Sequence, residues 1–215
     1  MIPFGSNAKT LVGGAFPPPA RRVKSPPMPT DADETLMLCY RDGEGDTDAF
    51  ARLYARHKGP LYRYLLRQCG QPAVAEELFQ DVWLKLIAGR AGYTVQAKFT
   101  TWLYRLAHNR LIDHYRASAR RLPASYADDC PEWAEIPAPV ETQPEHQEDR
   151  RRQAERLLEL LAELPEAQRE AFLLKEEAGL SLEAIAQATG TGRETVKSRL
   201  RYALARLRRG LGGTS

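Results

Sequence analysis

The segment that most constrains the fold of this chain lies near its C-terminus, where a glycine separates two short helical patterns. Apolar residues recur on one face of a helix that we expect over residues 182–189, and Ser181 is placed to cap its unpaired amides. Gly190 can adopt the positive φ at which many helices end. A second helix can start directly afterwards at Gly192. Two helices joined this closely predict a helix-turn-helix.

The second helix of this pair is strongly basic. Between residues 193 and 209 it carries seven Arg or Lys and one acid. Such a helix is attracted to DNA phosphates, and the side chains near its start can reach base edges in the major groove. A solvated basic face at the end of an ordinary helical bundle is the alternative. The outward residues that we expect to contact DNA are Arg193, Glu194, Lys197, Ser198 and Arg201.

Glu194 allows two interpretations. It stands three residues after Thr191, which is the spacing of a capping box that satisfies amides at a helix start. In the same position it could accept a hydrogen bond from a cytosine amino group. We predict the capping role.

Charge and proline divide the rest of the chain. Residues 1–30 hold seven prolines and four basic residues without an acid, which predicts a disordered basic tail, either without function or adding weak electrostatic binding. Helical patterns fill residues 31–121 and 149–210, whereas residues 122–148 hold five prolines, seven acids and no Lys or Arg. Residues 211–215 form a short tail. The fold class we expect is all-α, with two small helical domains joined by an acidic, proline-rich linker and a helix-turn-helix in the second domain.

Apolar spacing also predicts the individual helices of both domains. The first domain should contain a short helix that ends at Gly43 and a longer one that is bent or interrupted near Pro60. The further helices expected are one between Pro72 and Gly89, one over residues 100–121, one over 149–164 and one over 165–178.

Several function classes are excluded by what the chain does not contain. Its three cysteines form no CxxC pair and its four histidines have no metal-ligand spacing, so we expect no metal and no cofactor. No phosphate-binding loop or nucleophile motif is present, and we therefore expect no enzyme. No apolar run approaches the length of a membrane span, and the N-terminus lacks the pattern of a secretory signal. These observations predict a cytoplasmic protein without membrane insertion.

A second nucleic-acid surface is predicted on the helix over residues 100–121. Helical spacing places aromatic, basic and amide side chains along one side of it. That mixture suits unpaired DNA, because aromatic faces stack on bases and guanidinium groups hold the backbone. Trp102 and Tyr104 could instead be ordinary core aromatics. The residues along this side are Trp102, Arg105, Asn109, Asp113 and Arg116.

Four segments in this order resemble one known family. Residues 76–84, 99–116, 164–174 and 195–200 are similar to the corresponding segments of the extracytoplasmic-function sigma factors of bacterial RNA polymerase, and the resemblance extends over residues 31–210. It implies a factor that binds core RNA polymerase, recognises the minus-thirty-five and minus-ten promoter elements, and promotes DNA melting and transcription initiation. It also implies an anti-sigma factor as a further partner.

The resemblance assigns roles to the residues above. Arg193, Glu194, Lys197, Ser198 and Arg201 would meet the minus-thirty-five duplex. The loop that ends at Lys98 and Phe99 would hold a base flipped from the melted non-template strand, and the Trp102 to Arg116 side of the next helix would support it. Glu77, Gln80 and Asp81 would bind the polymerase clamp, although an ordinary acidic helix face is the alternative. The linker would thread through the nucleic-acid channels of the polymerase, or its charge would only keep a tether soluble.

Two other classes of protein fit parts of this pattern. A helix-turn-helix repressor or activator would bind duplex operator alone, usually as a symmetric dimer. An adaptor that works without polymerase would use the acidic linker and the amphipathic helices instead.

Overall fold

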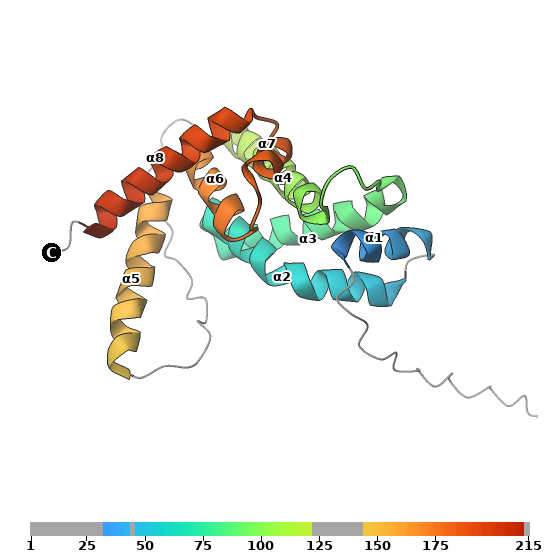
Figure 1. Ribbon diagram of the computed structural model, residues 1–215, viewed down its shortest axis with the longest axis horizontal. Coiled ribbons are helices and arrows are strands. Elements are labelled where there is room, and N and C mark those ends of the chain that lie inside the picture. The colour runs from blue at the N-terminus through green and yellow to red at the C-terminus, as the bar shows by residue number, and fades with distance from the viewer. Residues whose placement is uncertain (1–31, 44–45, 122–143, 213–215) are drawn as a thin grey trace, which may run out of the picture. The chain divides into compact units, whose positions relative to one another are not determined.

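The computed structural model describes residues 32–43, 46–121 and 144–212. Within these ranges the chain forms eight α-helices and one 3-10 turn and contains no strand (Figure 1). The all-α prediction is therefore confirmed. The expected N-terminal tail, linker residues 122–143 and residues 213–215 lie outside the described residues.

The first half of the described chain contains four α-helices and the 3-10 turn. Asp46 caps α2, because its carboxylate accepts from the amides of Asp48 at 3.0 Å and Ala49 at 3.3 Å. Gly70 ends the same helix with a φ of 73°, and Pro72 starts the next one. The bounds are α1 Asp33–Asp42, α2 Thr47–Cys69, α3 Pro72–Gly89, η1 Arg90–Gly92 and α4 Phe99–Arg121.

The expected interruption near Pro60 is wrong in one respect, because α2 is a single element that runs through this proline. A proline inside a helix removes one backbone hydrogen bond and costs about 3 kcal/mol. Leu53 lies before Pro60 and Leu61 and Leu65 follow it, and all three are completely buried. Each such leucine contributes about 1.5–3 kcal/mol when buried, which is enough to keep the helix continuous.

The second half of the described chain contains the other four α-helices. The helix predicted from residue 149 begins earlier, at Pro144, since a proline is well tolerated at the first helical position. Its far end lies so close to α8 that a Cβ built on Gly210 would stand 2.3 Å from Leu160. Any larger residue at this position would force the Leu160 side chain to move. The bounds are α5 Pro144–Ala162, α6 Glu166–Glu176, α7 Leu182–Thr189 and α8 Arg193–Gly212.

The two halves contact each other within the compact unit of residues 31–215. The carboxylate of Glu170 in α6 accepts from the Tyr64 hydroxyl of α2 at 3.1 Å and lies 2.6 Å from Nδ1 of His108 in α4. Burial, followed by the nearby Glu170 charge, holds the pKa of Tyr64 well above its usual range. Glu177 forms ion pairs with Arg63 at 2.9 Å and with Arg67. The second half thus rests on the first through polar contacts as well as through α7, which packs against α4.

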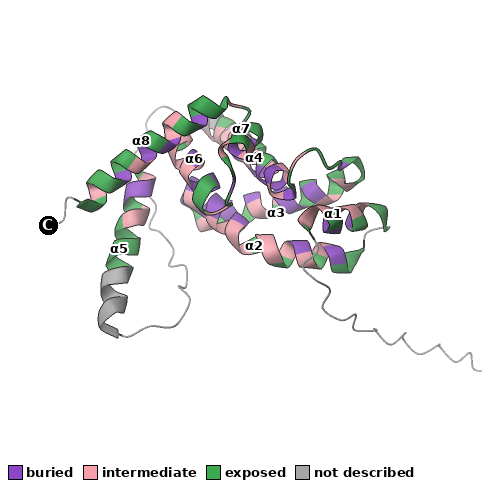
Figure 2. Cartoon of the chain, in the orientation of Figure 1, coloured by how far each residue is buried: buried purple, intermediate pink, exposed green. Residues whose placement is uncertain are grey.

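Buried residues line the inward sides of the helices (Figure 2). In the part of the chain that the structure describes, no helix combines the length and the hydropathy that a membrane span requires. The same part holds no group of His, Cys, Asp and Glu side chains arranged to bind a metal ion.

Candidate nucleic-acid interface

The helix-turn-helix predicted from the sequence is present. Its first helix, α7, covers Leu182–Thr189, and the Ser181 hydroxyl accepts from the Ala184 amide at 3.1 Å. Gly190 ends it with a φ of 63°. The Ser181 cap and the left-handed Gly190 are therefore confirmed, and both are consequences of local sequence.

The apolar stripe of α8 faces the core, since Val196, Leu200, Ala203 and Leu207 are buried. The five residues expected to contact duplex DNA lie on the other sides of the helix. Four of them are exposed and Ser198 is partly buried. The structure also exposes Tyr202, by 55%, with the Arg201 guanidinium 5.1 Å from its ring centre. Tyr202 was not among the residues predicted from the sequence, although its position outside the apolar stripe indicates an exposed side chain.

Arg193 is held by carboxylates from both helices of the motif. Its Nε lies 2.5 Å from Glu183 of α7 and its Nη1 lies 3.0 Å from Glu194. The hydrogen bond to Glu183 raises the pKa of Arg193, and the pKa of Glu183 is lowered by its own backbone amide and then by Arg193. Arg193 is therefore paired with acids of both helices at the beginning of α8. Glu183 was not among the predicted residues.

The capping box expected between Thr191 and Glu194 is absent from this described turn. The Thr191 hydroxyl lies 2.9 Å from that of Thr189, and the Glu194 carboxylate faces Arg193 and, at 3.8 Å, Lys197. The Glu194 carboxylate is thus paired with two neighbouring cations in place of the expected backbone amide. The predicted capping role of Glu194 is therefore wrong, and its side chain lies on the exposed side of the helix.

Helix α4 presents the second predicted surface. Its polar residues Arg105, Asn109, Asp113 and Arg116 are all exposed, at spacings that place them along one side. Trp102 at the start of this row is only partly buried, and its ring centre lies 5.0 Å from that of Tyr93. Tyr104 is 1% exposed and is a core residue. The two aromatics that the sequence left undecided thus have different environments.

The loop before α4 places the remaining two residues of this surface. Lys98 is exposed, whereas the Phe99 side chain is completely buried. Phe99 lies 5.2 Å from His57 and 6.1 Å from Trp102, measured between ring centres. It anchors the end of the loop in the core, while residues 94–98 remain at the surface.

The third predicted group lies on α3. Glu77 and Gln80 are exposed and Asp81 is partly buried, all on one side of the helix. Arg110 of α4 reaches across to this side and lies 2.6 Å from Asp81 and 3.1 Å from Glu77. One turn further on, Leu84 is 62% exposed; it was not among the residues predicted from the sequence. An open hollow beside it is lined by Asp81, Leu84, Lys85, Ala88, Arg110 and Asp113.

Comparison with known proteins connects both halves of the chain to one family. The sequence model of Sigma-70 region 2 matches residues 53–121, and that of Sigma-70 region 4 matches residues 154–207. The first match covers α3, α4 and most of α2, and the second covers the helix-turn-helix. The predicted surfaces on α4 and α8 therefore fall in two different matched regions.

Curated relatives and solved structures agree with these matches. The RNA polymerase sigma factor SigK of Mycobacterium sp. (strain KMS) is 30% identical, covering 88% of this chain and 95% of its own length. BldN of Streptomyces coelicolor is 29% identical, covering 85% of this chain and 67% of its own. The fold resembles that of the sigma factor RpoE of Bartonella quintana, solved with the anti-sigma factor NepR, at a TM-score of 0.64 and 23% identity over 77% of this chain and 98% of that one.

CnrH, solved with the cytosolic domain of CnrY, gives a TM-score of 0.62 at 22% identity, over 86% of this chain and all of that one. These two structures support the fold, and the sequence relatives support the family. The relatives are sigma factors, a class of transcription factors that are not enzymes. The chain belongs to the extracytoplasmic-function sigma factors, which recognise promoters and initiate transcription with RNA polymerase.

Proposed function

We propose that three surfaces of this chain divide the work of promoter recognition. The exposed side of α8 binds the minus-thirty-five duplex, the loop of residues 94–98 with the polar side of α4 holds the melted minus-ten strand, and the acidic side of α3 binds core RNA polymerase. The observation that carries this proposal is the exposure of the two polar rows, on α4 and α8, each within a separately matched sigma region.

The chemistry of α8 supports duplex binding. Lys197 and Arg201 are exposed cations one turn apart that can neutralise phosphates. Arg193, which pairs with Glu183, lies at the helix start, from which side chains reach base edges. The minus-thirty-five and minus-ten contacts are made by one polymerase-bound chain. Once one of them has formed, the other forms at a high effective concentration, so the two strengthen each other.

The α3 surface fits a protein partner. Leu84 offers an exposed apolar contact among charged neighbours, and buried apolar side chains surrounded by a polar rim are typical of protein interfaces. Because Arg110 already neutralises part of the charge of Glu77 and Asp81, the apolar contact at Leu84 carries much of the expected affinity for polymerase.

Other features of the proposal follow from the family. The chain has no catalytic activity of its own and acts in the cytoplasm, where the polymerase is. An anti-sigma factor restrains it, as the solved complexes of RpoE with NepR and of CnrH with CnrY suggest for this chain.

Run-off transcription with purified core RNA polymerase on genomic fragments tests the proposal directly. A specific transcript that depends on this chain is expected. On the promoter that this assay identifies, log affinity should fall with log salt less steeply for Lys197→Ala than for wild type. The magnitude of the slope should decrease by about one, since one phosphate contact is lost. Arg206→Ala is the matched control, because Arg206 is exposed but lies half a turn around α8 from Lys197.

Two outcomes would contradict the proposal. The absence of any specific transcript would reject promoter recognition by this chain. Equal salt slopes for Lys197→Ala and wild type would reject the phosphate contact and with it the assigned side of α8.

A further inference from the structure

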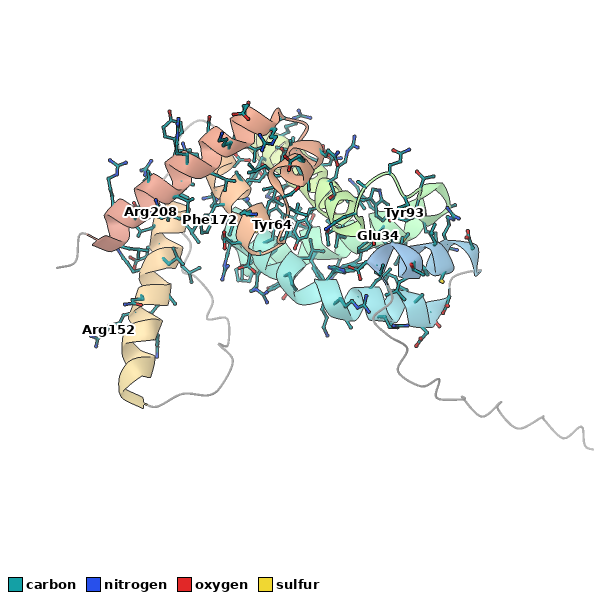
Figure 3. The ribbon with its side chains drawn as sticks, in the orientation of Figure 1. Glu34, Tyr64, Tyr93, Arg152, Phe172 and Arg208 are labelled. Carbon is teal, nitrogen blue, oxygen red and sulfur yellow. The ribbon has the colours of Figure 1, made fainter. Side chains whose placement is uncertain are left out.

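Helix α1 lies beside the loop that precedes α4, and polar contacts join the two (Figure 3, where Glu34 and Tyr93 are labelled). Glu34 contacts the end of the loop and Arg41 contacts its beginning. The resemblance gave α1 no role, and the match to Sigma-70 region 2 begins only at residue 53. The contacts made by this helix therefore need their own explanation.

The contact at the end of the loop replaces a missing helix cap. Lys98 precedes α4 and has no side-chain acceptor for the unpaired amides of the first helical turn. Glu34 supplies one from α1, since its Oε1 accepts from the Phe99 amide at 2.7 Å. A carboxylate at this place also interacts favourably with the positive end of the helix dipole. Glu34 thereby fixes where α4 begins and where the loop ends.

The contact at the beginning of the loop comes from the other end of α1. Nη1 of Arg41 donates to the Tyr93 carbonyl at 2.8 Å. Asp42 accepts from Nε and Nη2 of the same guanidinium, which orients its remaining edge toward the loop. The Tyr93 side chain is 3% exposed and packs against Trp102.

Between these anchors the loop is open to a ligand. Thr94, Val95, Gln96 and Lys98 are exposed, and the Val95 side chain is 53% exposed. The loop offers an apolar surface, an amide and a cation side by side, which can contact the face, the edge and the phosphate of a nucleotide.

Helix α1 is itself held in place. Asp33, next to Glu34, lies 2.6 Å from Arg56 and 2.7 Å from His57, both of α2. The His57 ring in turn lies beside the buried Phe99 ring, tilted by 50°. Helix α1, which carries both residues that contact the loop, is therefore itself attached to α2 and to the core of the first half.

We infer that Glu34 and Arg41 are positioning residues that hold loop 94–98 ready to receive an unpaired base of the non-template strand. Neither residue needs to touch DNA. Fixing the loop before binding removes the entropy cost of ordering it on binding, and so strengthens binding and sharpens the discrimination between bases. The inference rests on the proposed function, in which this loop holds the melted strand.

The experiment measures single-strand recognition by the holoenzyme formed from core polymerase and the full chain. The probe is a short single-stranded DNA with randomised central positions, and the bound strands are sequenced. Wild type should enrich particular bases. Glu34→Ala should weaken binding of the enriched strand about tenfold and flatten the preference, without changing the affinity for core polymerase.

Conservative and control variants separate positioning from folding. Glu34→Gln should restore most of the affinity, because an amide oxygen can still accept from the Phe99 amide. Asp48→Ala should behave as wild type, since Asp48 is an exposed acid at the start of α2, away from the loop contacts. Hydrogen exchange at the Phe99 amide should be faster in Glu34→Ala than in Glu34→Gln.

The possible results lead to different conclusions. If wild type enriches no base, the proposed role of the loop fails and the inference fails with it. If wild type enriches bases and Glu34→Ala enriches them equally, only the inference fails. Equal losses of polymerase and strand binding would show that Glu34 serves the fold alone. If Glu34→Ala does not fold, Arg41→Met decides through the other anchor, and full base preference in that variant would overturn the inference.

Discussion

The two elements that we propose bind DNA obtain their shape in different ways. The helix-turn-helix is determined locally, since Ser181 and Gly190 stand in sequence beside the helix ends that they fix. The loop before α4 is determined from a distance, since its anchors Glu34 and Arg41 are 65 and 52 residues away from the groups they bind. The comparison explains why the first element can be recognised in a sequence and the second cannot.

The difference also has energetic consequences. A local cap or turn contributes about 1 kcal/mol and acts on one helix end. The loop also ends at the buried Phe99 side chain, which lies against His57 of α2, so the loss of this side chain affects the surrounding core. We therefore expect substitutions around the loop to destabilise the protein more than substitutions in the turn of the helix-turn-helix.

The largest effect is expected for Phe99→Ala. Phe99 is completely buried at the junction of the loop and α4, and replacing a buried phenylalanine with alanine costs about 3–5 kcal/mol. Urea unfolding followed by circular dichroism measures this loss. Phe172→Ala is the matched control, because Phe172 in α6 is only partly buried and should cost less. Equal losses for both variants would contradict a special role for the loop anchor.

A smaller effect is expected for Gly190→Ala. Gly190 has a φ of 63°, and a Cβ added there would meet no atom within 4 Å, so the cost is conformational only. It should be about 1 kcal/mol in the free energy of unfolding. Gly192→Ala is the control, since its Cβ would meet only the Thr195 hydroxyl at an ordinary 3.7 Å. A loss at Gly192 as large as that at Gly190 would show that the turn is not governed by its left-handed residue.

The parts of the fold that sequence predicted follow the same division. Helix bounds were predictable where Pro72, Ser181 or Gly190 mark them, because capping and φ preferences are local. The continuity of α2 through Pro60 was not, because it depends on the burial of leucines on both sides. The early start of α5 was also missed, since Pro144 was assigned to the linker although proline is favoured at a first helical position.

The side chains at and around the candidate surfaces also include some that sequence could predict and others that it could not. The exposed rows of α4 and α8 were predictable from helical spacing. The ion pair of Glu183 with Arg193 and the contacts of Glu170 with Tyr64 and His108 were not, because they join residues from different helices. No periodic pattern reports which acid meets which base across a tertiary contact.

Tyr93, at the beginning of the loop, also predicts that the protein loses stability at alkaline pH. Of the effects predicted, this one is the smallest at neutral pH. Burial, and then the negative charges of Glu34 and Asp33, raises the pKa of Tyr93 from 10.0 to about 12. In the unfolded chain Tyr93 loses its proton near pH 10, whereas in the folded chain it holds it until about pH 12. The unfolded state thus binds fewer protons in this window, so stability falls as the pH rises through it.

The variant Tyr93→Phe tests this sign. The Tyr93 hydroxyl is buried without a hydrogen-bond partner among the described residues, so its removal should leave stability at pH 7 unchanged or slightly higher. Between pH 10 and 12 the variant should lose less stability than wild type, as urea unfolding at each pH can show. Tyr202→Phe is the control for the loss of a tyrosine hydroxyl, because Tyr202 is 55% exposed and lies on α8. If Tyr93→Phe and wild type lose stability equally above pH 10, the Tyr93 ring is not buried beside the acids of α1. That result would weaken the conclusion that tertiary contacts with α1 determine the shape of the loop.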